Sequence, residues 1–118
     1  MKIGFHLTPF WSPVDRGPTR IIDEAIQVVS AASRMGFAWV SMGQHWLSHP
    51  TVWPAPIPFL ARLAPETGSM RLKTSVLLLP LLNPVEVAEN VATLDQLTQK
   101  RRLRCIRAGR CKSRAWSR

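Results

Sequence analysis

Residues 72–99 read LKTSVLLLPLLNPVEVAENVATLDQLTQ, an apolar run joined to a stretch with helical periodicity. Leu72–Leu79 has the length and composition of a strand that is covered on both faces. Asn83 then suits a helix N-cap, Pro84 suits the first helical position, and Glu86 gives a near match to a capping box. We expect the helix to continue to residue 99. Its apolar side consists of Val85, Ala88, Val91, Ala92 and Leu94.

The residues before this stretch repeat the order of strand and helix. Ile3–Leu7 and Phe37–Met42 are short apolar runs typical of buried strands. Thr19–Met35 between them has helical periodicity, the segment 43–58 is a loop rich in proline, and Pro58–Ala64 predicts a short helix. The apolar face of the first helix consists of Ile22, Ala25, Ile26, Val29 and Ala32. This alternation predicts an α/β chain with right-handed β-α-β units and a parallel sheet.

Parallel sheets of this kind bind ligands at the carboxyl ends of their strands, either in an open doubly wound sheet or in a barrel. The first strand is followed by Thr8-Pro9-Phe10-Trp11-Ser12-Pro13, without the G-x-G-x-x-G sequence of dinucleotide-binding folds. The phosphate-binding sequence G-x-x-x-x-G-K-[ST] is also absent. The sequence therefore favours a barrel over a classical nucleotide-binding fold.

The basic charge is concentrated in residues 100–118, KRRLRCIRAGRCKSRAWSR, here called the basic stretch. It holds nine Lys and Arg residues and no acid, whereas residues 1–99 hold seven cations and seven acids. We expect a domain of residues 1–99 followed by a basic tail that is aberrant or disordered. So many cations can bind phosphates, which gives an alternative function as a small basic nucleic-acid-binding or interaction protein. Trp116 is the only aromatic residue there for base stacking, and no nucleic-acid motif is present, so nucleic acid is the less favoured partner.

The sequence contains no pattern that predicts export or membrane insertion. The N-terminus, MKIGFHLTPFW, lacks the features of a signal peptide. The longest apolar run, Val76–Leu82, contains Pro80 and is too short to span a bilayer. Cys105 and Cys111 fit no zinc or redox motif. We therefore expect a soluble, cytoplasmic protein.

Three segments resemble the bacterial luciferase-like flavin-dependent monooxygenases. They are KIGFHLTPF at 2–10, SRMGFAWVSMGQHW at 33–46 and the block 72–99. A strand that runs into L-P-x-x-[HN]-P and a helix that ends in T-L-D-x-L are characteristic of that family. The resemblance covers residues 1–99 and implies the N-terminal portion of a (β/α)8 TIM barrel. The chain is then truncated, because such a barrel typically needs about 250 residues.

The resemblance also implies a chemistry. Family members bind reduced FMN, or in some relatives a deazaflavin coenzyme, at the top of the barrel. They react it with molecular oxygen and transfer one oxygen atom to a small organic substrate. A flavin reductase is an expected partner, and the intact family implies a homo-oligomer. In a truncated chain we expect weak FMN binding and little activity, because TIM barrels commonly hold phosphate with loops after the seventh and eighth strands.

The resemblance finally implies site residues. His45 matches one histidine of a Glu-His-His motif at the end of the second strand, and it is the catalytic candidate. The corresponding stretch is Gly43-Gln44-His45-Trp46, which lacks the acid and the second histidine of that motif. The family bends its third strand with a non-prolyl cis peptide, which falls at Ser75–Val76. The candidates for cofactor binding are Ser75, Val76 and Asn83, and those for the substrate pocket are Phe10, Trp11 and Trp46.

Each candidate also has a purely structural interpretation. His45 can be a loop histidine without a role, the aromatic residues can be ordinary core, and Asn83 can be only a helix cap. We expect His6, inside the first strand, to be buried and hydrogen-bonded. His45 and His49 are four residues apart, but the surrounding prolines predict a loop and no third ligand is in view. No metal site is therefore expected.

Overall fold

Four parallel strands form a single sheet whose spatial order follows the chain. They are β1 (Phe5–Leu7), β2 (Trp39–Met42), β3 (Arg71–Leu77) and β4 (Leu103–Ala108), in the order β1-β2-β3-β4. The structure, a computed structural model, describes residues 1–8, 18–46, 53–98 and 103–108, the last of these as backbone. All three strand pairs are parallel, which confirms the predicted sheet.

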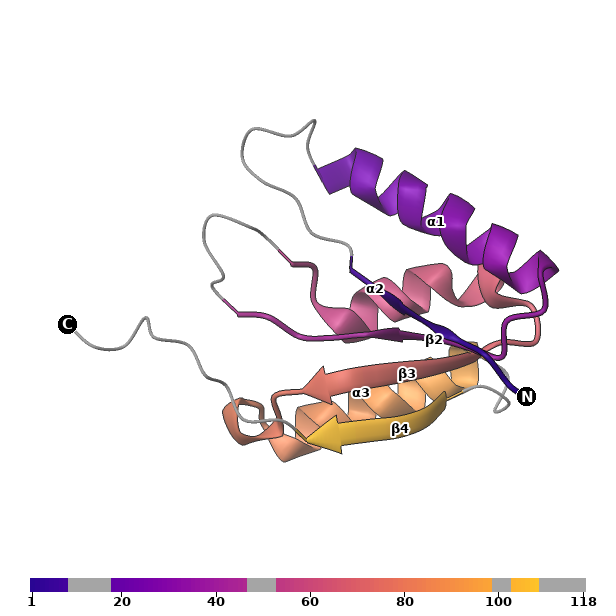
Figure 1. Cartoon of the computed structure of the whole chain (residues 1–118). Helices are drawn as coiled ribbons and strands as arrows, with labels where there is room; N and C mark the ends of the chain where they lie inside the picture. The colour runs from indigo at the N-terminus through magenta and orange to yellow at the C-terminus, as the bar shows by residue number, and fades with distance from the viewer. Residues whose placement is uncertain (9–17, 47–52, 99–102, 109–118) are drawn as a thin grey trace.

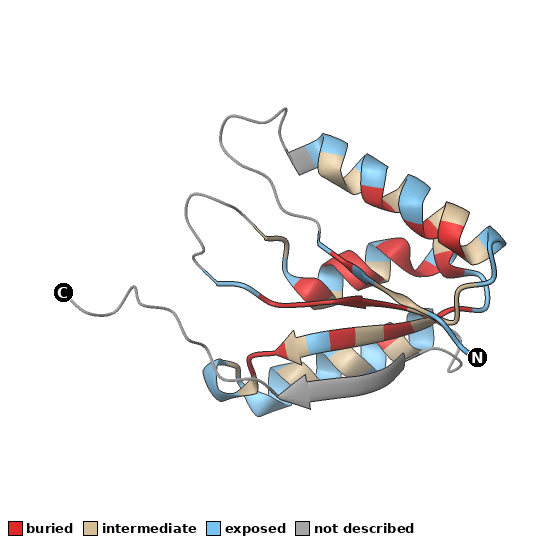
Figure 2. Cartoon of the chain, in the orientation of Figure 1, coloured by how far each residue is buried: buried red, intermediate tan, exposed pale blue. Residues whose placement is uncertain are grey.

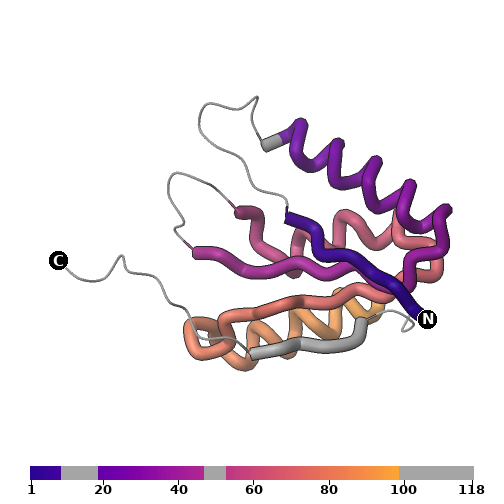
Figure 3. Tube along the Cα trace, viewed as in Figure 1, coloured from indigo at the N-terminus to yellow at the C-terminus, as the bar shows by residue number. Residues whose placement is uncertain are grey.

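A helix connects each strand to the next (Figures 1 and 3). The helix α1 (Pro18–Arg34) follows β1, α2 (Pro56–Leu63) follows β2, and α3 (Pro84–Leu97) follows β3. Two short 3-10 turns, η1 (Ala64–Thr67) and η2 (Leu79–Leu81), lie at the two ends of β3. The result is three successive β-α-β units, as in one part of a (β/α) barrel.

The pairing register gives the sheet two different faces. One face has rows of buried or half-buried residues, such as Phe5, Val40 and Leu72, which are Cα partners across three strands. Leu7 and Met42 form the next such row and are also buried. Helices cover this face, and Figure 2 shows the buried residues concentrated on β2, α2 and the inner side of α1. The core cluster consists of Leu7, Ala25, Val29, Ala32, Val40, Met42, Phe59, Leu60, Leu63, Ala64, Met70, Leu72 and Leu94.

The opposite face, here called the concave face, alternates with the core face along each strand. His6, Ser41 and Lys73 are Cα partners in its central row. This arrangement contradicts the prediction that the third strand is covered on both faces. Ser75 is exposed and Lys73 is only half-buried, because no helix among the described residues covers this side of β3.

The first helix matches its prediction, and the third differs from it. Ala25, Val29 and Ala32 of α1 are buried, as its periodicity indicates. In α3 only Leu94 of the predicted apolar face is buried, whereas Val85 is 67% exposed. The reason is that the main contact of α3 is with α2, along one edge, so most of its surface remains uncovered.

Strand β4 lies within the basic stretch and pairs with β3. Residues 99–102 and 109–118 lie outside the described residues, so the boundary between a domain of residues 1–99 and a basic tail stays a prediction. In the part of the chain that the structure describes, no helix has the length and hydropathy needed to cross a membrane.

Candidate functional site

His45 lies just beyond the carboxyl end of β2, and a strand end is the position that the sequence predicts for it. His45 follows β2 by three residues and is exposed. Its ring stacks on Trp53, with centroids 4.1 Å apart and the planes tilted by 33°. An exposed imidazole held against an indole at the end of a barrel strand is suitably placed to contact a ligand.

Gly43 marks a narrow space between neighbouring strands. A Cβ atom on this residue would lie 3.1 Å from the backbone oxygen of Ser75, 3.6 Å from His45 Nε2 and 3.8 Å from His6 Cε1. A methyl group there would be tightly packed against the Ser75 backbone. The absence of a side chain at position 43 therefore lets His6, His45 and the Ser75 backbone lie close together around a narrow gap, which a methyl group would fill only if its neighbours shifted.

The peptide bond between Ser75 and Val76 is cis, which confirms the position that the resemblance indicated. Ser75 is exposed and Val76 is half-buried. The backbone oxygen of Val76 accepts a hydrogen bond from the backbone N–H of Gln44 at 3.0 Å. The end of β3 is thus joined directly to the segment that carries Gly43 and His45.

Gln44 is a structural residue whose role the sequence interpretation missed. Its side-chain oxygen accepts a hydrogen bond from the backbone N–H of Leu78 at 2.8 Å, and the residue is only 8% exposed. The comparison with the family motif indicated only that an acid is missing from the stretch 43–46. An uncharged amide serves here because the position requires a hydrogen-bond acceptor and is buried, where a negative charge would be costly. A polar residue two positions after an apolar strand was the available signal.

His6 is hydrogen-bonded, as predicted, but it is exposed and not part of the core. Its Nδ1 lies 2.9 Å from Ser41 Oγ. The prediction of burial was wrong because His6 points to the concave face, on the side opposite the helices. Ser41, by contrast, is only 3% exposed and forms a fixed support for the ring.

Cationic groups also lie on the concave face. Lys73 Nζ lies over the ring of Trp39, 4.3 Å from its centroid. Gly4 accommodates this indole, since a Cβ atom at position 4 would overlap the Trp39 ring. None of the strands β1, β2 and β3 contains an acidic residue. The described strands therefore give this face a positive character.

The remaining residues that the sequence analysis considered are Asn83, Trp46, Phe10, Trp11 and His49. Asn83 caps α3, because its Oδ1 accepts a hydrogen bond from Val85 N–H at 2.9 Å. Trp46 is 44% exposed just beyond His45. Phe10, Trp11 and His49 lie outside the described residues. Among the residues that are described, no group of three His, Cys, Asp or Glu side chains is arranged to hold a metal ion.

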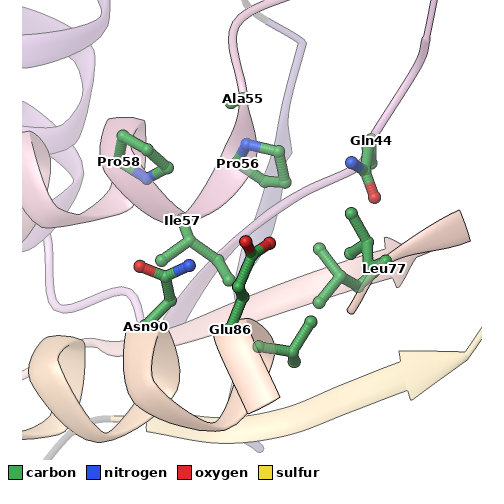
Figure 4. Close-up of a pocket in the computed structure, with 10 residues that line it drawn as sticks. Gln44, Ala55, Pro56, Ile57, Pro58, Leu77, Glu86 and Asn90 are labelled. Carbon is green, nitrogen blue, oxygen red and sulfur yellow. The ribbon is translucent and has the colours of Figure 1, made fainter. Parts of the chain in front are cut away.

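A second concave feature lies between α2 and α3 (Figure 4). It is a groove of about 190 Å³ with mainly apolar walls, and it also contains Glu86 and Asn90 of α3. Gln44 lines one side of it, so the residue that joins β2 to β3 lies between the strand ends and this groove. The groove is therefore mostly a hydrophobic surface to which Glu86 adds a carboxylate, whereas His6 lies on the concave face of the sheet.

A family model described as luciferase-like monooxygenase matches residues 1–105. Limonene 1,2-monooxygenase from Rhodococcus erythropolis is 29% identical over 101 residues, which are 86% of this chain and 26% of that protein. The oxygenase component of the flavin-dependent trigonelline monooxygenase of Acinetobacter baylyi is 29% identical over 82 residues, 70% of this chain and 23% of the relative. The chain thus spans about a quarter of the length of these curated relatives.

Solved structures show the same fold. The oxygenating constituent of 3,6-diketocamphane monooxygenase from Pseudomonas putida, a type II Baeyer-Villiger monooxygenase in complex with FMN, aligns with a TM-score of 0.79. It is 23% identical and is matched over 94% of this chain and 30% of its own. A monooxygenase from Streptomyces bottropensis aligns with a TM-score of 0.77 at 30% identity, over 87% of this chain and 31% of its own.

These matches agree with the β-α-β arrangement. The four described strands correspond to one part of the TIM barrel of the solved relatives. Because the family model covers residues 1–105 of 118, the chain belongs to the luciferase-like monooxygenase family.

Proposed function

We propose that this chain contributes the flavin-ring end of the site in an FMN-dependent monooxygenase. The observation that carries the proposal is the close grouping of His6, His45 and the backbone oxygen of Ser75 around Gly43. This group lies at the carboxyl ends of parallel strands, where barrel enzymes place their ligands. Family membership supplies the flavin as the group that would lie against these residues.

The residues present fit a flat aromatic ring. Gly43 places no side chain against the Ser75 backbone, so a ring would not be held away from that backbone. Exposed polar groups lie nearby, namely His6, His45 and Ser75, and His45 is stacked on Trp53. We propose that the backbone of Ser75 and Val76 lies against the ring and that His45 contacts its edge. Asn83 uses Oδ1 to cap α3, so its side-chain N–H groups remain available for the cofactor.

Bound reduced FMN would supply the reaction with molecular oxygen that monooxygenation requires. The chain would then orient the ring, exclude water and hold a proton. His45 is the group for proton transfer at Nε2, because an imidazole nitrogen can both donate and accept a proton. Trp46, together with Phe10 and Trp11, would form the apolar wall of a pocket for a small organic substrate and keep water from the ring.

Reduced flavin has to be delivered to such an enzyme. The Acinetobacter baylyi relative is named as an oxygenase component, which supports a separate flavin reductase as a partner here. The FMN complex of the Pseudomonas putida relative supports FMN as the cofactor, with a deazaflavin coenzyme as the alternative. A cytoplasmic location is part of the same proposal, because reductases of this kind supply flavin within the cell.

Flavin binding to the 118-residue chain tests this proposal. We expect saturable quenching of FMN fluorescence on titration with the protein, and the same for lumiflavin, which carries the ring without the phosphate. Gly43→Val would weaken both by at least about tenfold, because the side chain would fill the space beside Ser75. Gln27→Leu, an exposed change on α1, serves as the matched control and is expected to leave binding unchanged.

Failure of folded wild-type protein to bind either flavin would contradict the proposal. A preference for a deazaflavin over FMN in the same titration would support the alternative cofactor. Salt-dependent retention on DNA, lost when the cations of the basic stretch are replaced by glutamine, would favour the alternative function in nucleic-acid binding.

A further inference from the structure

His6 and His45 approach the same small space from two different strands. The position that a Gly43 Cβ would take lies 3.8 Å from His6 Cε1 and 3.6 Å from His45 Nε2. His45 is expected in this family's site, whereas His6 was expected to be a core residue. Its exposed position on the concave face, beside the same space, calls for a functional explanation.

The hydrogen bonds around Ser41 allow two tautomers of His6, one for each direction of the hydrogen bond between Ser41 and His6. Ser41 Oγ donates to the backbone oxygen of Phe5 at 3.4 Å and lies 2.9 Å from His6 Nδ1. A serine hydroxyl has a single proton to donate. When that proton is directed to Phe5, the hydroxyl accepts from Nδ1–H of His6. The ring is then the Nδ1–H tautomer, with a free lone pair on Nε2.

The residue that supports this ring belongs to the interior of the sheet. Ser41 is buried, and the β1–β2 register places it directly beside His6. Within the described part of the chain, Nε2 of His6 has no hydrogen-bond partner. An exposed imidazole whose first nitrogen is held by a buried residue loses little conformational entropy when its second nitrogen binds a ligand.

We propose that His6 is a second ligand-binding imidazole of the flavin site and accepts a hydrogen bond at Nε2 from an N–H group of the bound ring. Ser41 is the positioning residue that holds His6 in the required tautomer. This inference rests on the proposed function, and it adds a residue from β1 to a site otherwise made by β2 and β3. His6 and His45 then contact the ring from opposite sides of Gly43.

Nitrogen NMR of the histidine side chains tests the positioning role without any flavin. At mildly alkaline pH we expect His6 of the wild-type protein to be mainly the Nδ1–H tautomer. Ser41→Ala would shift it toward the Nε2–H tautomer, which isolated imidazoles prefer. Ser30→Ala removes a different serine hydrogen bond, the one to Arg34 on α1, and would leave the His6 signals unchanged. A wild-type His6 in the Nε2–H form would overturn the proposal.

Lumiflavin titration tests the binding role with two complementary variants. His6→Asn retains a polar atom near the Nδ1 position but loses Nε2, and we expect about fivefold weaker binding, the loss of one hydrogen bond. His6→Gln places its amide near the Nε2 position and is expected to retain most of the affinity. Both changes are at an exposed residue, so both proteins are expected to fold.

The two possible failures are distinguishable. If wild-type protein binds lumiflavin and His6→Asn binds it equally well, the role of His6 is wrong and the proposed function stands. If folded wild-type protein binds no flavin, both the proposed function and the role of His6 are contradicted. Weaker binding by His6→Asn than by His6→Gln, with an unchanged Ser30→Ala protein, supports the proposal.

Discussion

Leu78 donates its backbone N–H to the side-chain oxygen of Gln44 at 2.8 Å, and this buried hydrogen bond joins the ends of β3 and β2. The backbone N–H of Gln44 donates in turn to the Val76 oxygen at 3.0 Å. Gln44 stands between Gly43 and His45 in the chain. The two hydrogen bonds therefore hold both residues in place against β3, and with them the space that we assign to the flavin ring.

Replacing Gln44 tests this anchoring role. Gln44→Leu leaves the Leu78 N–H buried without an acceptor, and we expect the free energy of unfolding to fall by about 1–3 kcal/mol. Urea denaturation followed by circular dichroism measures this loss. Gln27→Leu on the exposed surface of α1 is the matched control, with an expected change within about 0.5 kcal/mol. Equal stability of the two variants would show that Gln44 does not anchor the strand ends.

Alanine substitutions at Gly36 and Gly43 distinguish the effect of an unfavourable backbone conformation from the effect of a filled gap. Gly36 has φ of +79° with nothing near its Cβ position, so Gly36→Ala is expected to cost about 1–2 kcal/mol of stability and leave flavin binding intact. Gly43 has no such φ but lies close to Ser75, so Gly43→Ala is expected to reduce flavin affinity more than stability. Thermal melts and flavin titrations on both proteins distinguish the two effects. The reverse pattern would contradict the assignment of Gly43 to the site.

Asn83 provides a test of whether a helix cap also binds the cofactor. Asn83→Ala removes the hydrogen bond to Val85 and is expected to cost about 1 kcal/mol in the free energy of unfolding. Asn83→Asp keeps a capping oxygen but loses the side-chain N–H groups. We therefore expect Asn83→Asp to keep wild-type stability and to bind FMN more weakly. Unchanged FMN binding by Asn83→Asp would restrict the residue to its capping role.

The uncovered parts of the sheet predict self-association of the 118-residue chain. In the described structure β1 and β4 each pair with one neighbour, and the concave face has no helix over it. Open strand edges and uncovered faces favour pairing with another chain. Sedimentation velocity is expected to show association that increases with concentration and decreases in Ile3→Lys, which adds a charge at an exposed position before β1. A monodisperse monomer with a cooperative, high-temperature melt would contradict this prediction.

Much of the fold could be predicted because its signals are local. Asn83 and Pro84 mark the start of α3, and the spacing of Ala25, Val29 and Ala32 indicates the buried face of α1. The exposure of α3 and of one face of β3 could not be predicted in this way. Apolar periodicity shows which side of an element prefers burial, but only the arrangement of neighbouring elements determines whether anything covers it.

The candidate site was predictable in part. His45 follows an apolar strand in a motif that resembles the family's, so its position at a strand end was expected and is confirmed. The role of Gln44 was not predicted, and His6 was wrongly predicted to be a core residue. Their roles depend on partners 34 and 35 residues away in the chain, Leu78 and Ser41, which periodicity and motif spacing do not identify.

The sequence by itself determined the order of elements, the parallel α/β class and the family, because helix caps, apolar periodicity and short motifs act between residues close in the chain. Only the tertiary structure decided that His6, Gly43, His45 and Ser75 border one space. The physical reason is strand register. A shift of one residue between paired strands would turn these side chains to the opposite face of the sheet, and the register depends on the packing of the whole core.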